Sequence, residues 1–249
     1  MSGEVAWLSG VHAVVAALEA GRPIDLVWIQ KGRKGQRIQR IVELAAERNV
    51  PVRFVPRVDL ERVARGSAHA GVAARSAPRA FVALESLVRP AGSKGRLLVL
   101  DSVTDPHNVG AVIRSAAAFG IDGVVLAGRG VPPLSGAVAA AAAGHLETVP
   151  VARASVAGDA LRKLRDAGYW VYGGETAGTP LWAVRPPERW AVVLGSEGRG
   201  LRAKTKAFLD EIIAIPMKPG VESLNVSVAA AILAYSLTEA GNSHRTDND

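Results

Sequence analysis

Two polar side chains in residues 100–118 (LDSVTDPHNVGAVIRSAAA) are suited to chemistry on a phosphate-bearing substrate. Asn108 follows an Asp-Pro turn, where it would serve as N-cap and satisfy free amides of the next helix. Arg114 lies one turn beyond Gly110, over backbone that glycine leaves bare and beside a helix N-terminus that attracts phosphate. Its neighbours are apolar, so we expect a bound partner for the guanidinium. The plainer interpretations are capping for Asn108 and solvation for Arg114.

A second polar loop, residues 195–200 (GSEGRG), follows the apolar run 191–194. It lacks the spacing of a dinucleotide fingerprint and the Gly-Lys-Ser/Thr ending of a P-loop. A nicotinamide oxidoreductase and an ATPase are therefore disfavoured. Alone, such a loop is most often only a turn.

A third loop, residues 216–226 (PMKPGVESLNV), precedes the last predicted helix. Ser223 and Asn225 lie where either would cap that helix. Leu224 lies between them, and three more apolar residues would complete a pocket wall whose backbone groups read a planar base. These residues are Leu194, Ile215 and Met217.

The charge of the chain is unevenly distributed. The 249 residues carry a formal net charge of +7; residues 1–75 hold 12 Lys/Arg against 7 Asp/Glu, whereas residues 96–249 hold 15 of each. A basic module joined to a neutral one favours polyanion binding by the first and chemistry by the second. A merely solvated basic surface explains the charge equally well.

Composition also narrows the class of protein. The chain is 49% apolar and has no cysteine, which excludes disulfides and thiolate sites. Its five histidines are scattered without zinc-site spacing. No apolar run approaches the ~18 residues of a membrane span, and no signal region opens the chain. We expect a cytoplasmic protein with no metal and no membrane partner.

The pattern of apolar residues predicts two α/β modules. Residues 1–75 form a small sandwich with Ser9 as the first N-cap, strands at 26–29, 52–55 and 71–74, and helices at 11–19, 36–48 and 59–64. Residues 76–95 are a linker, and residues 242–249 a disordered tail. Residues 96–241 alternate strand and helix, which indicates a mostly parallel sheet covered on both faces. Its predicted strands are 97–100, 124–126, 148–151, 170–172, 190–194 and 211–215, and its predicted helices are 110–119, 136–143, 156–167, 204–209 and 226–240.

A basic stripe marks the first module. Arg33, Arg37 and Arg40 fall at i, i+4 and i+7, near Lys31 and Lys34. If the helix begins early enough, they line one exposed face that would contact nucleic-acid phosphates. A solvated helix face is the commoner reason for such a stripe.

Three motifs in order resemble the SpoU/TrmH branch of the SPOUT RNA methyltransferases. They read DPHNVGAVIRSA (105–116), LGSEGRGL (194–201) and IPMKPGVESLNVSVA (215–229). The first module, with GVHAV at 10–14 and GVAA at 71–74, is similar to the L30e-like substrate-binding domain of enzymes that methylate a guanosine of 23S (large-subunit) rRNA. The resemblance covers nearly the whole chain.

The resemblance implies an α/β-knot domain with a deep trefoil knot, S-adenosylmethionine as cofactor, and a homodimer. It places the cofactor contacts on Gly195, Ile215 and Leu224, largely through their backbones, with Leu194, Met217 and Val226 beside them. It places the reaction centre on Arg114, Asn108, Glu197, Ser223 and Asn225.

The implied reaction is in-line transfer of a methyl group to a ribose 2′-hydroxyl. Family accounts make Arg114 the base, but a guanidinium stays protonated in proteins, so we favour orientation of an RNA phosphate and stabilisation of the developing alkoxide. Asn108 and Ser223 would hold the ribose and the arginine, and Glu197 would orient neighbouring groups. No metal is needed.

One departure affects the RNA contacts. Residues 137–143 are almost pure alanine, where relatives often carry basic or hydroxyl side chains. RNA binding would then rest on the first module and on Arg199 with the basic residues that follow it.

Alternatives remain at this stage. The same chemistry on a tRNA ribose, or on an rRNA site that confers antibiotic resistance, fits the motifs equally. A non-catalytic RNA-binding ribosome factor fits the basic module alone. RNA is selected largely by shape and single-stranded loops, so the motifs do not identify the nucleotide.

Overall fold

The computed structural model describes residues 6–64, 68–88, 93–134, 136–196, 198 and 200–243. It divides into two compact units that interleave along the chain. Unit 1 comprises Met1–Ala80, Val109–Arg114 and Pro132–Thr148; unit 2 comprises Phe81–Asn108, Ser115–Val131 and Val149–Asp249. The sequence boundaries at the 76–95 linker therefore stay a prediction.

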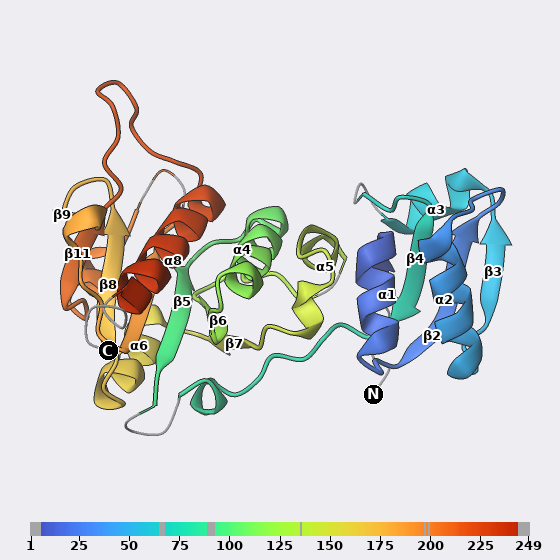
Figure 1. The fold of residues 1–249 in the computed structure, drawn as a ribbon, viewed down its shortest axis with the longest axis horizontal. Helices are drawn as coiled ribbons and strands as arrows, with labels where there is room; N and C mark the ends of the chain where they lie inside the picture. The colour runs from blue at the N-terminus through green and yellow to red at the C-terminus, as the bar shows by residue number, and fades with distance from the viewer. Residues whose placement is uncertain are drawn as a thin grey trace. The chain divides into compact units, whose positions relative to one another are not determined.

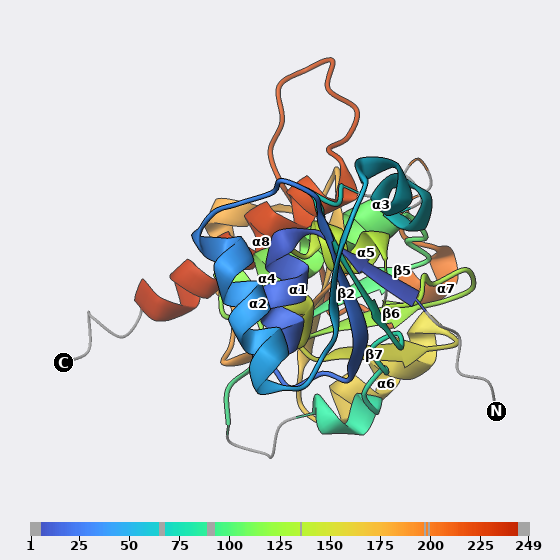
Figure 2. The ribbon, with the colours of Figure 1, turned by 90° about the vertical axis from the view of Figure 1, so that its right-hand side faces the viewer.

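Unit 1 is built on a four-stranded sheet with the order β1-β4-β2-β3. Figure 1 labels β2, β3 and β4 of this sheet. Strands β2 and β3 are parallel, and β4 runs antiparallel to both β1 and β2. Helices α1 and α2 lie side by side (Figure 2). The elements are β1 Ala6–Ser9, α1 Val11–Glu19, β2 Ile24–Gln30, α2 Gln36–Glu47, β3 Val52–Val55, α3 Arg57–Ala64 and β4 Val72–Ser76, with α5 Ala137–Ala141 and the 3-10 helix η2 His145–Glu147 from later in the chain. The predicted α/β class is confirmed; strand β1 was not predicted.

Two local predictions in unit 1 are wrong. Ser9 ends β1, and Gly10 (φ 103°) is the N-cap of α1, without a side-chain cap. The positive φ lets the chain turn directly from strand into helix. Helix α2 begins only at Gln36 after Gly35, so Arg33 precedes it and the basic residues do not form one helical stripe.

Unit 2 contains a seven-stranded sheet with the order β7-β6-β5-β10-β8-β11-β9. Every described strand pair in it is parallel. The strands are β5 Gly95–Asp101, β6 Gly123–Ala127, β7 Val151–Ala154, β8 Trp170–Glu175, β9 Thr179–Pro180, β10 Arg189–Leu194 and β11 Glu211–Ala214. The helices are η1 Leu84–Ser86, α6 Ala157–Asp166, η3 Leu181–Ala183, α7 Ala203–Lys206 and α8 Val226–Ser243. Helix α4 Pro106–Ala118 is divided between the units, since its residues Val109–Arg114 belong to unit 1. The parallel α/β prediction is confirmed, whereas the threading of a trefoil knot stays a prediction.

Consecutive glycines on β8 show that both faces of this sheet are covered. A Cβ at Gly173 would lie 2.4 Å from Leu209, and a Cβ at Gly174 would lie 2.9 Å from Leu233 of α8. Successive residues of a strand point to opposite faces. Side chains therefore pack tightly on each side of β8, and glycine leaves room for both.

The alanine-rich segment has a packing explanation. A Cβ at Gly110 of α4 would lie 2.5 Å from Cβ of Ala141 and 2.6 Å from the carbonyl oxygen of Val138 in α5. Helix α5 therefore packs against the backbone of Gly110, where the side chain of Arg114 was predicted to lie. Small side chains let two helices approach closely, which accounts for the alanine at position 141.

The buried hydroxyl of Tyr172 provides a pH-dependent prediction. Burial, followed by the charges of Glu211 and Asp210, raises its pKa to about 12 from 10.0. A raised folded-state pKa contributes stability that is complete below pH 10 and is lost as pH rises toward 12, a loss of about 2 kcal/mol. We expect Tyr172→Phe to flatten this alkaline decline in the free energy of unfolding, measured by urea denaturation at several pH values. The same change at exposed Tyr235 should leave the decline unaltered.

Candidate functional site

A cleft of about 640 Å³ lies in unit 2 where strands β8, β10 and β11 end. Loops that leave the carboxyl ends of parallel strands are the usual position of sites in open α/β sheets. Its lining includes the ends of all three strands and the start of α8. The structure brings together all six residues predicted to contact a cofactor, Leu194, Gly195, Ile215, Met217, Leu224 and Val226.

The loop after β10 folds back on itself. A Cβ at Gly195 would lie 2.1 Å from the carbonyl oxygen of Gly200, so only glycine fits. The amide of Gly200 donates to the carbonyl oxygen of Ser196 at 3.1 Å. Two predicted site residues of this loop, Glu197 and Arg199, lie outside the described residues.

Asn108 is not the cap that the sequence suggested. Helix α4 starts earlier, with Asp105 as N-cap accepting from the amide of His107 at 3.1 Å. Asn108 is buried inside the first turn, where its Oδ1 accepts from Nδ2 of Asn225 at 3.0 Å. Burial of this paired amide ties the start of α4 to the start of α8.

Asn225 joins this contact to the cap of α8. Its Oδ1 accepts from the amide of Ser227 at 2.8 Å and from the hydroxyl of Ser227 at 2.6 Å. Of the two residues predicted as alternatives, Asn225 is therefore the N-cap of α8. Ser223 is exposed and lines the cleft. The amide pair therefore orients the segment that carries Ser223.

Arg114 is exposed on α4, six residues after Asn108. It forms no hydrogen bond or ion pair with the residues that the structure describes. The part of α4 that carries Arg114 belongs to unit 1, whereas the cleft belongs to unit 2. A role for Arg114 at the reaction centre stays a prediction.

A second hollow, of about 630 Å³, lies in unit 1 and has a basic lining. Arg33, Lys34 and Arg37 line it with His12, whose Nε2 is 2.9 Å from Nη1 of Arg37. A guanidinium can only donate hydrogen bonds, so Nε2 of His12 is the acceptor in this contact. No acidic residue is among the described lining, so the hollow favours an anion.

The other two basic residues predicted for RNA binding in the first module are not part of the lining of this hollow. Lys31 and Arg40 are exposed, and Arg40 pairs with Glu19 at 3.4 Å. His12 was not among the residues predicted to bind RNA, although the sequence Gly-Val-His at residues 10–12 could have indicated it. The carboxylate of Glu175 in the cleft lining was missed as well, because a lone acidic residue at a strand end has no motif.

Metal-ligating clusters and membrane-spanning helices are both absent from the part of the chain that the structure describes. No group of three or more His, Asp or Glu side chains there is placed to hold a metal ion. No helix in the same part of the chain has the length and apolar character needed to cross a membrane.

Both halves of the chain match family models. Residues 95–235 match the SpoU rRNA Methylase family. Residues 7–82 match a family described as RNA 2'-O ribose methyltransferase substrate binding. Together the matches extend over most of the chain, in the order predicted from the motifs.

Two sequence relatives are named as tRNA/rRNA methyltransferases. A Staphylococcus haemolyticus protein named as a TrmH family tRNA/rRNA methyltransferase is 36% identical over 232 residues, covering 92% of this chain and 93% of that protein. A Synechocystis protein named as an uncharacterized tRNA/rRNA methyltransferase is 39% identical over 236 residues and 92% of this chain. That alignment spans 61% of the Synechocystis protein, less than two thirds of its length.

Solved structures share the fold. A crystal structure of an RNA 2'-O ribose methyltransferase has a TM-score of 0.83 at 25% identity, covering 96% of this chain and 90% of that one. An AdoMet-bound rRNA methyltransferase from Sinorhizobium meliloti has a TM-score of 0.78 at 23% identity, covering 94% and 87% of the two chains.

Proposed function

Because the chain belongs to the SpoU rRNA methylase family, we propose that it transfers a methyl group from S-adenosylmethionine to a ribose 2′-hydroxyl of RNA, at a guanosine of 23S rRNA. The observation that carries this proposal is the strand-end cleft, into which all six predicted cofactor residues converge. The choice of 23S rRNA rests on the resemblance of the N-terminal module to a substrate-binding domain.

The cleft fits S-adenosylmethionine in size and chemistry. Its volume of about 640 Å³ lies in the range of sites that bury a ligand of this size. Leu194, Ile215 and Leu224 offer apolar contact to a base, and Gly195 contributes backbone to the lining. When bound, the cofactor supplies an electrophilic methyl group on a sulfonium sulfur.

The polar residues around α4 and α8 have complementary tasks in this proposal. Transfer of the methyl group to the ribose oxygen would leave a neutral thioether, and the hydroxyl proton would pass to solvent water. Ser223 would bind the ribose, held in place by the Asn108–Asn225 pair behind it. Arg114 would orient a phosphate and stabilise the developing negative charge on the oxygen. Glu197 would orient neighbouring groups.

RNA recognition is proposed for the basic hollow of unit 1. Arg33, Lys34 and Arg37 would neutralise backbone phosphates, and His12 would add a hydrogen-bonding group. Lys31 and Arg40 are proposed as further contacts of unit 1, and Arg199 as a contact from the loop after β10. The basic hollow and the cofactor cleft share no described lining residue.

A homodimer is the proposed assembly. Val228 and Tyr235 of α8 are seven residues apart, on one helix face, and Trp182 of η3 is 70% exposed. Helix α8 contacts η3 within unit 2. Large exposed apolar side chains of this kind support a protein interface.

Methyl transfer to separated RNA pools tests the proposal. Purified protein and methyl-labelled S-adenosylmethionine are incubated with unmodified 23S rRNA, with tRNA, or without RNA. We expect label in 23S rRNA, recovered after digestion as 2′-O-methylguanosine. Label in tRNA alone would move the substrate to tRNA, and another 2′-O-methylnucleoside in rRNA would favour a different site. An absence of both cofactor binding and transfer would favour a non-catalytic RNA-binding factor.

A further inference from the structure

Glu175 occupies a bridging position at the end of β8. This strand lies between β10 and β11, the two strands that release the loops at the cleft. In the sheet register Glu175 is opposite Ala214, the residue before Ile215. The backbone of Glu175 therefore lies beside the start of the loop that follows β11. Its side chain contacts the end of the loop that follows β10.

The two carboxylate oxygens of Glu175 have different partners. Oε1 accepts from the backbone amide of Leu201 at 3.0 Å, and Oε2 pairs with Nζ of Lys206 at 2.8 Å. Leu201 is only 4% exposed. A buried amide that loses its acceptor is costly, whereas the partly exposed pair with Lys206 contributes little.

The bond to Leu201 holds the far end of the folded loop that begins at Gly195. The amide of Gly200, immediately before Leu201, bonds back to Ser196, and the carbonyl oxygen of Gly200 covers Gly195. A shift of Leu201 would therefore move the backbone that lines the cleft at Gly195. No catalytic contact of Glu175 is required for this effect.

Resting on the proposed function, we propose that Glu175 is a positioning residue for the cofactor. Its carboxylate fixes the loop after β10 to the end of β8, which sets the position of Gly195 relative to Ile215. The side chain acts through the amide of Leu201. It should therefore affect the affinity for S-adenosylmethionine far more than the rate of methyl transfer once the cofactor is bound.

Four full-length variants test this role. Glu175→Met keeps the length of the side chain but removes both acceptors, and Glu175→Gln keeps an oxygen for Leu201. Lys206→Met removes the ion pair alone, and Lys163→Met, which removes another exposed lysine paired with a carboxylate, is the matched control. The readouts are the Kd for S-adenosylmethionine by calorimetry, KM and kcat for methyl transfer, and thermal unfolding without cofactor.

For Glu175→Met we expect Kd and KM for S-adenosylmethionine to rise about 10- to 100-fold, with kcat within about threefold of wild type. Glu175→Gln should have a Kd for S-adenosylmethionine within about threefold of the wild-type value. Both lysine variants should keep this Kd in the same range. Glu175→Ala serves as a second variant without acceptors if Glu175→Met does not fold.

A wild-type Kd for S-adenosylmethionine in folded Glu175→Met or Glu175→Ala would overturn the positioning role while leaving the proposed function intact. Weak binding by Glu175→Gln equal to that of Glu175→Met would also overturn it, because the amide of Leu201 would then not be the point of action. A wild-type chain that binds no S-adenosylmethionine would refute both proposals.

Discussion

Arg114→Ala should lower the rate of methyl transfer by about 10²- to 10³-fold while leaving the Kd for S-adenosylmethionine unchanged. The loss follows from removal of a fixed positive charge where negative charge develops on the ribose oxygen. Cofactor binding should survive because the described lining of the cleft comes entirely from residues 174–233. Single-turnover transfer and calorimetry measure the two quantities separately.

Arg114→Lys and Arg162→Ala are the controls for that result. Lysine keeps the charge but lacks the planar fork of the guanidinium, so we expect partial activity. Arg162 is an exposed helical arginine paired with Asp159, and its removal should leave turnover unaltered. Normal turnover by Arg114→Ala would overturn the assignment. Rescue of that variant by added guanidinium ion would support electrostatic stabilisation.

The sequence predicted that the loops after β10 and β11 converge, because the signals for this are local. Each of the cofactor loops follows an apolar strand, and parallel strands deliver their ends to one edge. The convergence of Gly195, Ile215 and Leu224 could therefore be inferred from the order of strands and motifs. The strand order of the sheet could not, since it depends on pairing between distant segments.

The polar half was predicted less well. Asp105 and Asn108 are both good caps, and the sequence pattern could not choose between them. The structure shows Asp105 as the cap, which leaves the buried amide of Asn108 to bond with Asn225, 117 residues later. Such a pair has no local periodicity, and the same is true of Glu175 and Leu201.

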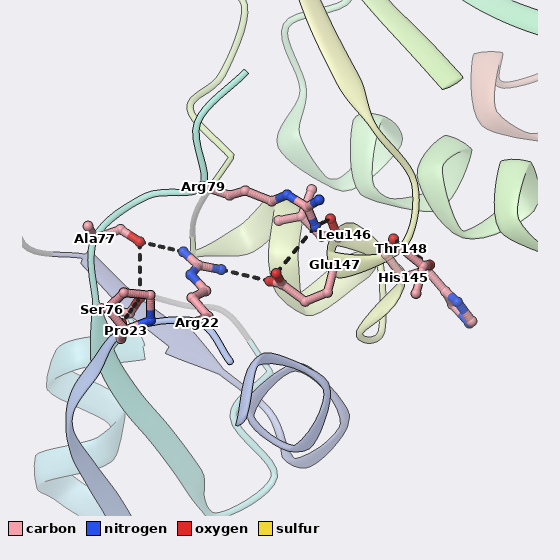
Figure 3. Close-up of polar contacts among 9 residues, drawn as sticks. All are labelled: Arg22, Pro23, Ser76, Ala77, Arg79, His145, Leu146, Glu147 and Thr148. Atoms are coloured by element: carbon pink, nitrogen blue, oxygen red, sulfur yellow. Dashed lines mark hydrogen bonds and ion pairs between the residues drawn. The ribbon is translucent and has the colours of Figure 1, made fainter. Parts of the chain in front are cut away.

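Glu147 illustrates a long-range contact within unit 1. Its residue number falls in the segment matched by the methylase model, yet η2 packs with the N-terminal elements. Its Oε1 pairs with Nη1 of Arg22 at 2.8 Å, and its Oε2 with Nη1 of Arg79 at 3.2 Å (Figure 3). Arg22 also donates to the carbonyl of Ala77, and Arg79 to that of Leu146.

Glu147→Ala should therefore lower the free energy of unfolding of unit 1 by about 3 kcal/mol. The side chains of Glu147 and Arg22 are 10% and 8% exposed, so loss of the carboxylate leaves a nearly buried guanidinium without its counter-charge. Urea denaturation followed by tryptophan fluorescence measures the change, aided by the packed Trp7–Trp28 pair of this unit.

Glu43→Ala is the matched control, since this exposed carboxylate of α2 accepts a hydrogen bond from Gln39 at the surface. Its effect should stay within about 0.5 kcal/mol. The double variant Arg22→Met/Glu147→Leu should recover part of the loss, because removing both charges removes the unpaired one. Stability of Glu147→Ala equal to that of Glu43→Ala would show that solvent compensates Arg22, and that the ion pair does not hold η2 to the N-terminal elements.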